Sequence, residues 1–133
     1  MTSALGWGSF AAVGLGAALG AWLRWALALA FNALWPQLPP GTLLANLVGG
    51  YLIGLALGWF ALDPQLSVEL RLLVVTGFLG GLTTFSAFSA EAVGLLARQQ
   101  YGWAAAHIGL HVGGSLLATA LGFATLRLLK GAG

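Results

Sequence analysis

The sequence contains no cysteine and very few charged residues. Of its 133 residues, 6% are charged and 59% are hydrophobic. Without cysteine, neither a disulfide nor a thiolate metal site can form, and the redox compartment cannot be inferred. Because about a quarter of the residues of a soluble domain are charged, this composition excludes an ordinary soluble domain. The net charge of +2 rests on few residues and does not indicate nucleic-acid binding.

Four long apolar segments fill the chain, and no basic region precedes the first of them, so a cleavable signal peptide is not expected. The segments run over residues 5–35, 41–62, 68–98 and 103–129, as approximate bounds. A helix of about 20 apolar residues crosses a bilayer, so each segment is long enough to span one. The sequence therefore predicts an all-α integral membrane protein with four transmembrane helices in a single domain, residues 1–133.

The third segment contains the most unusual stretch of the chain, which reads GFLGGLTTFSAFSAE over residues 77–91. Gly80 and Gly81 weaken a helix because glycine loses the most backbone entropy there. The hydroxyls of Thr83 and Thr84 can bond to local backbone. We therefore expect the helix to break near residues 80–83 and to resume at about Thr84. Such a break must be buried in protein or face a polar cavity or an ion; the alternative is a glycine-rich surface for helix packing.

Polar residues inside the first two segments allow two interpretations each. Arg24 either extends to the nearer membrane interface or lines a vestibule that attracts anions. Asn46 either joins two helices by hydrogen bonds or turns its NH2 donors toward a permeating anion, with Thr42 on or near the same face.

The fourth segment places His107, His111 and Ser115 on one helical face, since they are four residues apart. These side chains allow three interpretations. They form hydrogen bonds between helices, they form a polar track for a permeating ion, or the two histidines share a metal. The sequence offers no evident third ligand for a metal. Glu91 in the third segment is either a carboxylate with a partner near a helix end or a proton-coupling group.

The distribution of charge hardly selects an orientation in the membrane. With four spans, one side of the membrane has three basic residues, Arg71, Arg127 and Lys130. The other side has Arg98, and also Arg24 if its side chain extends that way. This bias is too small for the positive-inside rule to decide. Insertion in both orientations would allow an antiparallel homodimer with a two-fold axis in the membrane plane.

Three motifs resemble those of a known family. Residues 80–89 read GGLTTFSAFS and resemble the GGxTTFSTF signature of the Fluc-type fluoride channels, also called CrcB proteins, with Ala87 in place of the usual threonine. GTLLAN at 41–46 is similar to the family's GTLxxN, and GAWLR at 20–24 to its GAxxR. The likeness covers all four segments in the same order.

The resemblance implies a channel, not an enzyme, in the inner (plasma) membrane of the cell. It would export fluoride from the cytoplasm down the electrochemical gradient and confer fluoride resistance. Family members are dual-topology antiparallel homodimers with two pores and a structural Na+ at the dimer interface. Carried over by position, the backbone carbonyls that would hold the sodium ion belong to Gly80 and Thr83.

The resemblance also implies the groups that line the fluoride pathway. Fluoride is strongly hydrated, so hydrogen-bond donors and the positive edges of aromatic rings must replace its water. In this sequence two histidines replace neutral groups in the fourth-segment track. The pathway residues are Thr42, Asn46, Phe85, Phe88, His107, His111 and Ser115, with Arg24 as the vestibule candidate.

Two other functional classes compete with the channel. A small multidrug-type proton-coupled antiporter needs an acidic residue in the first segment, and Glu91 would have to replace it. An intramembrane hydrolase would use Ser86 or Ser89 with a histidine, but the GxSxG elbow is missing. A protein whose glycines only pack helices would have no transport activity.

Overall fold

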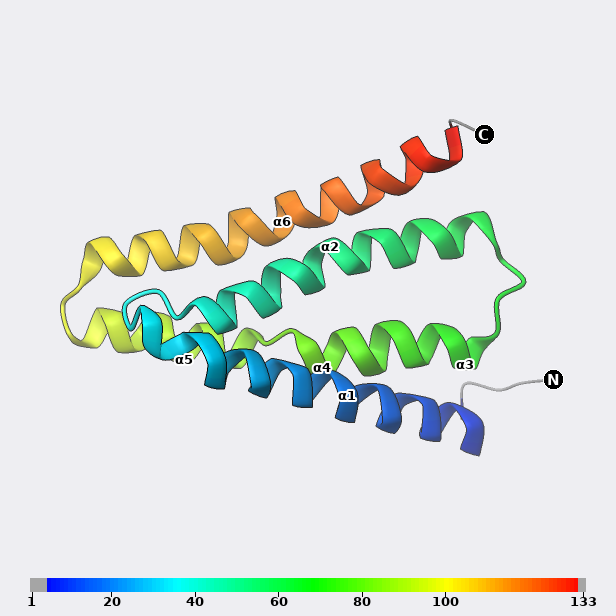
Figure 1. Cartoon of the computed structure of the whole chain (residues 1–133), viewed down its shortest axis with the longest axis horizontal. Helices are drawn as coiled ribbons and strands as arrows, with labels where there is room; N and C mark the ends of the chain where they lie inside the picture. The colour runs from blue at the N-terminus through cyan, green and yellow to red at the C-terminus, as the bar shows by residue number, and fades with distance from the viewer. Residues whose placement is uncertain (1–4, 132–133) are drawn as a thin grey trace.

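A computed structural model describes residues 5–131, and every regular element in that range is helical. The elements are α1 (Trp7–Phe31), η1 (Asn32–Leu34), α2 (Pro40–Leu62), α3 (Val68–Arg71), η2 (Leu72–Leu79), α4 (Gly80–Leu82), α5 (Phe85–Ala97) and α6 (Tyr101–Gly131). Figure 1 shows them as long rods lying side by side. α3, η2, α4 and α5 follow one another along one rod.

Four helical stretches are long and apolar enough to cross a membrane. They are Trp7–Leu34, Pro40–Leu62, Val68–Ala97 and Tyr101–Gly131. The all-α architecture with four such helices is thus confirmed, and the last of them begins two residues before the expected position. The starts of α1 and α3 and the ends of α2 and α6 lie at one end of the molecule (Figure 1).

The third stretch changes its helical geometry twice. Ser67 caps its start, since its hydroxyl accepts a hydrogen bond from the Leu70 amide at 3.1 Å. η2 is then a π-helix over eight residues, an uncommon geometry that is frequent at functional sites. After α4 the backbone is extended at Thr83 and Thr84, with ψ angles of 155° and 114°.

The interruption therefore follows the two glycines, which remain helical, instead of beginning at them. Gly81 is used for close approach, because a Cβ there would lie 2.5 Å from the Ala17 carbonyl oxygen of α1. The threonines end the helix by competing for backbone groups. Thr83 Oγ1 donates to the Leu79 carbonyl at 2.8 Å, and Thr84 Oγ1 accepts from the Ala87 amide at 3.0 Å.

Gly50, Gly54 and Gly58 recur every four residues in the sequence, which predicts a small-residue surface on α2 for a neighbouring helix, and this surface packs against α6. A Cβ on Gly54 would meet the Thr119 carbonyl oxygen and would lie 3.0 Å from the Gly122 Cα. A Cβ on Gly58 would lie 2.6 Å from Leu126. The predicted small-residue surface for a neighbouring helix is therefore confirmed, and these two backbones approach each other closely.

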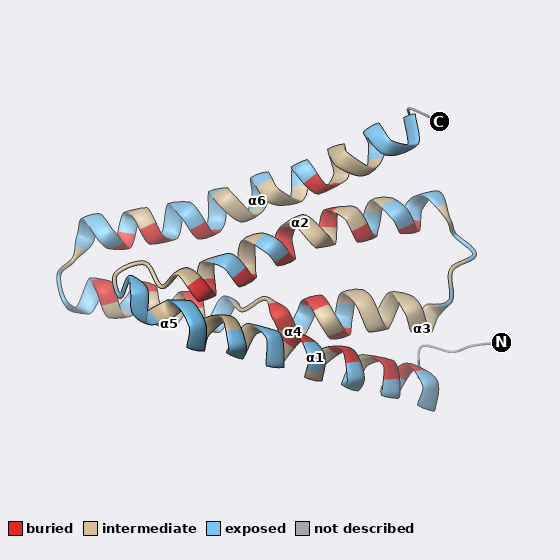
Figure 2. Ribbon diagram, viewed as in Figure 1, coloured by how far each residue is buried: buried red, intermediate tan, exposed pale blue. Residues whose placement is uncertain are grey.

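The outer faces of the long helices are apolar. Phe10 on α1 and Leu116 on α6 are 74% and 69% exposed, and Figure 2 shows the buried residues mainly on the inward faces. In lipid such exposure costs nothing, because the surroundings are equally apolar. Trp35 and Trp103 meet edge to face at 6.0 Å at one end of the bundle, a position typical of interfacial aromatic residues.

Candidate functional site

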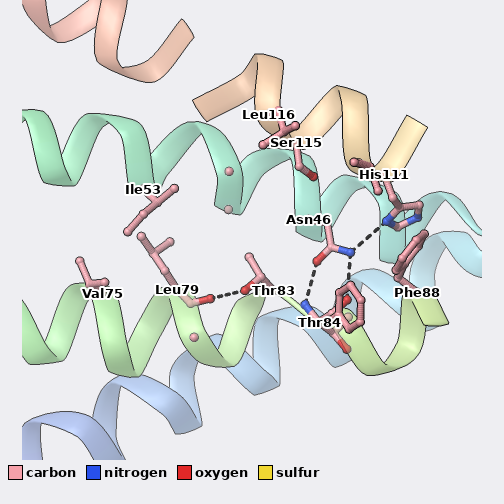
Figure 3. Close-up of a pocket in the computed structure, with 15 residues that line it drawn as sticks. Asn46, Ile53, Val75, Leu79, Thr83, Thr84, Phe88, His111, Ser115 and Leu116 are labelled. Atoms are coloured by element: carbon pink, nitrogen blue, oxygen red, sulfur yellow. Dashed lines mark hydrogen bonds between the residues drawn. The ribbon is translucent and has the colours of Figure 1, made fainter. Parts of the chain in front are cut away.

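A cavity of about 480 Å³ opens beside the interrupted stretch. It collects side chains from α2, α5 and α6 together with the backbone around Thr83 (Figure 3). Most of the residues predicted for the fluoride pathway or the sodium site lie in its wall. These are Asn46, Gly80, Thr83, Phe85, Phe88, His111 and Ser115, whereas Thr42, His107 and Arg24 are not among the lining residues.

Asn46 holds the interruption in place. Its Oδ1 accepts from the Thr84 amide at 2.7 Å, and its Nδ2 donates to the Thr84 carbonyl at 3.1 Å. The same Nδ2 lies 3.0 Å from His111 Nδ1, which therefore accepts (Figure 3). Asn46 thus makes the interhelical bonds that one interpretation expected. A role toward an anion stays a prediction.

Arg24 supports the interruption from the opposite side. Its Nε donates to the Gly81 carbonyl at 2.9 Å. In a continuous helix an amide of the next turn would donate to this carbonyl, but the backbone beyond Leu82 is extended and supplies no such amide. The partly buried guanidinium of α1 takes the place of the missing amide, a role that neither interpretation from the sequence had included.

The aromatic wall of the cavity consists of an outer and an inner ring. Phe85 is 78% exposed and Phe88 is 8% exposed, with ring centroids 5.5 Å apart. The inner ring stacks on His107 with centroids 5.3 Å apart and meets His111 at 4.9 Å. The exposed ring can therefore move or be replaced with little effect on the fold, whereas the inner one is fixed by both imidazoles.

A buried polar cluster lies behind that aromatic wall. Thr42 Oγ1 donates to Glu91 Oε2 at 2.8 Å, and Glu91 Oε1 lies 3.4 Å from His107 Nε2. Asn32 fixes the threonine by accepting from its backbone amide at 3.0 Å. Glu91 is thus the partnered carboxylate of one interpretation. Asn32 was not among the residues predicted from the sequence. Its amide side chain stands three residues before Trp35-Pro36, where a side chain can bond the backbone at two helix ends.

The serines of the interrupted stretch make no contact that would support hydrolysis. Ser86 Oγ lies 3.2 Å from Thr84 Oγ1, a neighbour in the same turn. His107 and His111 instead contact Glu91, Phe88 and Asn46. The described residues therefore give no support to the hydrolase interpretation. Nothing favours the antiporter, since α1 contains no acidic side chain.

Comparison with known proteins gives a consistent result. A family model described as "CrcB-like protein, Camphor Resistance (CrcB)" matches residues 11–123. A protein of Pseudomonas putida (strain W619) named "Fluoride-specific ion channel FluC" is 59% identical over 123 residues, which cover 92% of this chain and 97% of the relative. A protein of the same name from Cupriavidus pinatubonensis is 63% identical over 120 residues, 90% of this chain and 95% of the relative.

A third relative of that name, from Tolumonas auensis, is 59% identical over 122 residues, 92% of this chain and 96% of the relative. The similarity therefore includes all four apolar helices and the cavity. The protein is a multi-pass membrane protein and not an enzyme. The chain belongs to the CrcB family, the Fluc-type fluoride channels.

Proposed function

We propose that this protein is a fluoride-selective channel that exports the ion from the cytoplasm across the inner membrane, down its electrochemical gradient. The observation that carries the proposal is the cavity, which combines aromatic rings with hydrogen-bond donors beside an interrupted helix. The names of the relatives support the identity of the ion. Fluoride would leave water at Phe85, pass Phe88 and meet the donors of His111 and Ser115. No fixed positive charge lines the cavity, so the ion is held weakly and can leave.

The third span would act as a broken membrane helix that frees two carbonyl groups. In a continuous helix the Thr84 amide would donate to the Gly80 carbonyl, but here it donates to Asn46. In the same way the Ala87 amide donates to the Thr84 hydroxyl instead of the Thr83 carbonyl. Because hydrocarbon cannot satisfy carbonyl oxygens, a cation at this point fits the chemistry of the site. These are the two carbonyls that the family resemblance assigns to sodium.

Two copies of the chain, inserted in opposite orientations, would complete the site. Two carbonyls from each copy, of Gly80 and Thr83, would surround one Na+ and replace its hydration shell. The exposed position of Gly80 and the small charge bias between the two sides of the membrane support this arrangement. Each copy would contribute its own cavity, which gives two pores per antiparallel homodimer.

Fluoride efflux from liposomes tests the proposed function. Vesicles that contain the purified protein should release fluoride, whereas chloride loaded in parallel should be retained. Phe85→Ile should lower the fluoride rate about tenfold or more, because the aliphatic side chain lacks the positive edge of the ring. Phe10→Ile is the matched control, since Phe10 is similarly exposed but lies on α1, away from the cavity. Efflux equal to that of empty vesicles would contradict the proposal.

Removal of sodium tests the structural ion. In a buffer with N-methylglucamine instead of Na+, the fraction of dimer in detergent should fall. A ligand at 100 times its dissociation constant stabilises the bound state by about 2.7 kcal/mol, which is roughly a hundredfold shift in the equilibrium. Size-exclusion chromatography or energy transfer between labelled copies measures the fraction of dimer. K+ serves as a control for the size of the cation. A dimer fraction that is equal in all three cations would remove this role.

A further inference from the structure

We propose that Glu91, His107 and His111 bind a divalent transition-metal ion such as Zn2+. One ligand atom of each side chain lies within 4.8 Å of the other two. The histidines are one helical turn apart on α6, the spacing at which two imidazoles share a metal, and α5 supplies the carboxylate. This third ligand is what the sequence alone did not provide. The inference goes beyond fluoride conduction and does not rest on it.

Two buried atoms of this cluster lack a hydrogen-bond partner. They are Glu91 Oε1 and His111 Nε2. His111 as a whole is only 4% exposed. Such an atom destabilises a folded protein by about 1–3 kcal/mol, so native structures rarely leave one without a purpose. A cation bound by Glu91 Oε1 and, once its proton has moved to Nδ1, by His111 Nε2 would give both atoms a partner. They are therefore the observation that points to a ligand.

The spacing of two of the three ligand atoms suits a small cation. His107 Nε2 and Glu91 Oε1 are 3.4 Å apart, and Oε1 accepts no hydrogen bond. Tetrahedral zinc with bonds of about 2.0–2.1 Å places its ligand atoms about 3.3–3.4 Å from one another. A metal that binds both atoms would thus need little movement of α5 relative to α6.

The second oxygen of the carboxylate is already fixed. Thr42 Oγ1 donates to Glu91 Oε2 at 2.8 Å, which leaves Oε1 directed toward His107. Thr42 is itself buried and held by Asn32. Outer contacts of this kind orient metal ligands, and their loss typically lowers metal affinity about 10- to 100-fold.

Binding replaces two existing contacts of the imidazoles. The 3.3 Å contact of His107 Nε2 with the Phe88 carbonyl is long for a hydrogen bond, so its loss costs little. His111 Nδ1 accepts from Asn46, so its proton resides on Nε2. A metal at Nε2 would move that proton to Nδ1 and displace the Asn46 contact, while Asn46 keeps its two bonds to Thr84.

The donor set selects the class of metal. Two imidazole nitrogens and one carboxylate oxygen favour Zn2+, Co2+ or Ni2+ over Ca2+ and Mg2+, which prefer oxygen ligands. The cluster lies near the end of the bundle where α6 begins. Glu91 is 21% exposed, and His107 is six residues into α6, which is about 9 Å along the helix.

Metal titration of the full-length protein in detergent tests this site, with a purification tag that contains no histidine. Co2+ should bind one ion per chain and produce visible absorption bands of a low-symmetry nitrogen and oxygen site. Zn2+, followed by calorimetry, should displace it. His107→Gln, His111→Gln and Glu91→Gln should each lower the affinity at least about tenfold. Glu69→Gln, in the first turn of α3, should bind as the parent does.

Thr42→Val provides a second test if a ligand variant does not fold. It replaces the hydroxyl that donates to Glu91 and accepts from Asn32 with a methyl group. It should lower Co2+ affinity about tenfold, and Thr42→Ser should restore it. Circular dichroism during heating confirms that each variant is folded. Absence of Co2+ or Zn2+ binding at millimolar metal would overturn the proposal, and so would folded ligand variants that bind like the parent.

Discussion

Asn46→Ala is expected to destabilise the protein and to lower fluoride efflux at least about tenfold. The variant leaves the Thr84 amide and carbonyl without the partners at 2.7 and 3.1 Å that the Asn46 side chain provides. Each unsatisfied backbone group costs about 1–3 kcal/mol, so the loss should be about 2–6 kcal/mol in total. In lipid no water replaces these bonds. Denaturant unfolding in mixed micelles measures the stability, and liposome efflux measures the transport.

Tyr51→Phe is the matched control for this variant. It removes one hydrogen bond, from Tyr51 on α2 to the Thr125 hydroxyl on α6 at 2.9 Å. The expected cost is about 1 kcal/mol, with efflux retained, because neither residue lines the cavity. Equal effects of the two substitutions would show that the hydrogen bonds from Asn46 to Thr84 have no special role.

Gly54→Ala and Gly122→Ala are expected to disrupt the packing of α2 against α6. A Cβ on Gly122 would meet the Tyr51 carbonyl oxygen and would lie 3.0 Å from the Leu55 amide nitrogen, and both are backbone atoms that cannot rotate away. The two helices must separate, which costs about 1–3 kcal/mol or more for each added methyl group. Unfolding in mixed micelles should show this loss for each variant alone.

Gly109→Ala and Gly113→Ala in the same helix supply the control. A Cβ at either position would meet nothing within 4 Å. Alanine is the better helix former by about 0.5–1 kcal/mol, so these two variants should be as stable as the parent or slightly more stable. If all four substitutions had the same effect on stability, helix propensity and not close approach would explain these glycines of α2 and α6.

Local features of the sequence were sufficient to predict the membrane helices and the face on which α2 packs. Uninterrupted apolar length alone predicts four spans, because a helix must cover the hydrocarbon thickness. The four-residue repeat of Gly50, Gly54 and Gly58 likewise predicts a surface for a neighbouring helix, since such residues share one face. The structure identifies α6 as that neighbour.

The third span was expected to break near residues 80–83 and to resume at about Thr84, and the extended backbone lies at Thr83 and Thr84. Glycine propensity places the break near Gly80, but Gly81 is held in a helix by its close packing against Ala17. Tertiary packing outweighs an intrinsic preference of about 1 kcal/mol. The extended backbone falls where side chains can replace helical donors, at Thr83 and Thr84, with Asn46 and Arg24 supplying the partners.

The sequence by itself determined that the chain crosses a membrane four times, that its third segment contains a weak helix, and that its motifs are those of the CrcB family. Those properties depend on composition and on neighbours along the chain. Only the tertiary structure decided that Glu91 joins His107 and His111, because α5 and α6 pack side by side. It also decided that Asn46 and Arg24 satisfy the backbone of a different helix. The Asn46–Thr84 bond joins residues that are 38 positions apart in the sequence, and the Arg24–Gly81 bond joins residues that are 57 positions apart. Such bonds depend on how the helices pack, which a local sequence pattern does not specify.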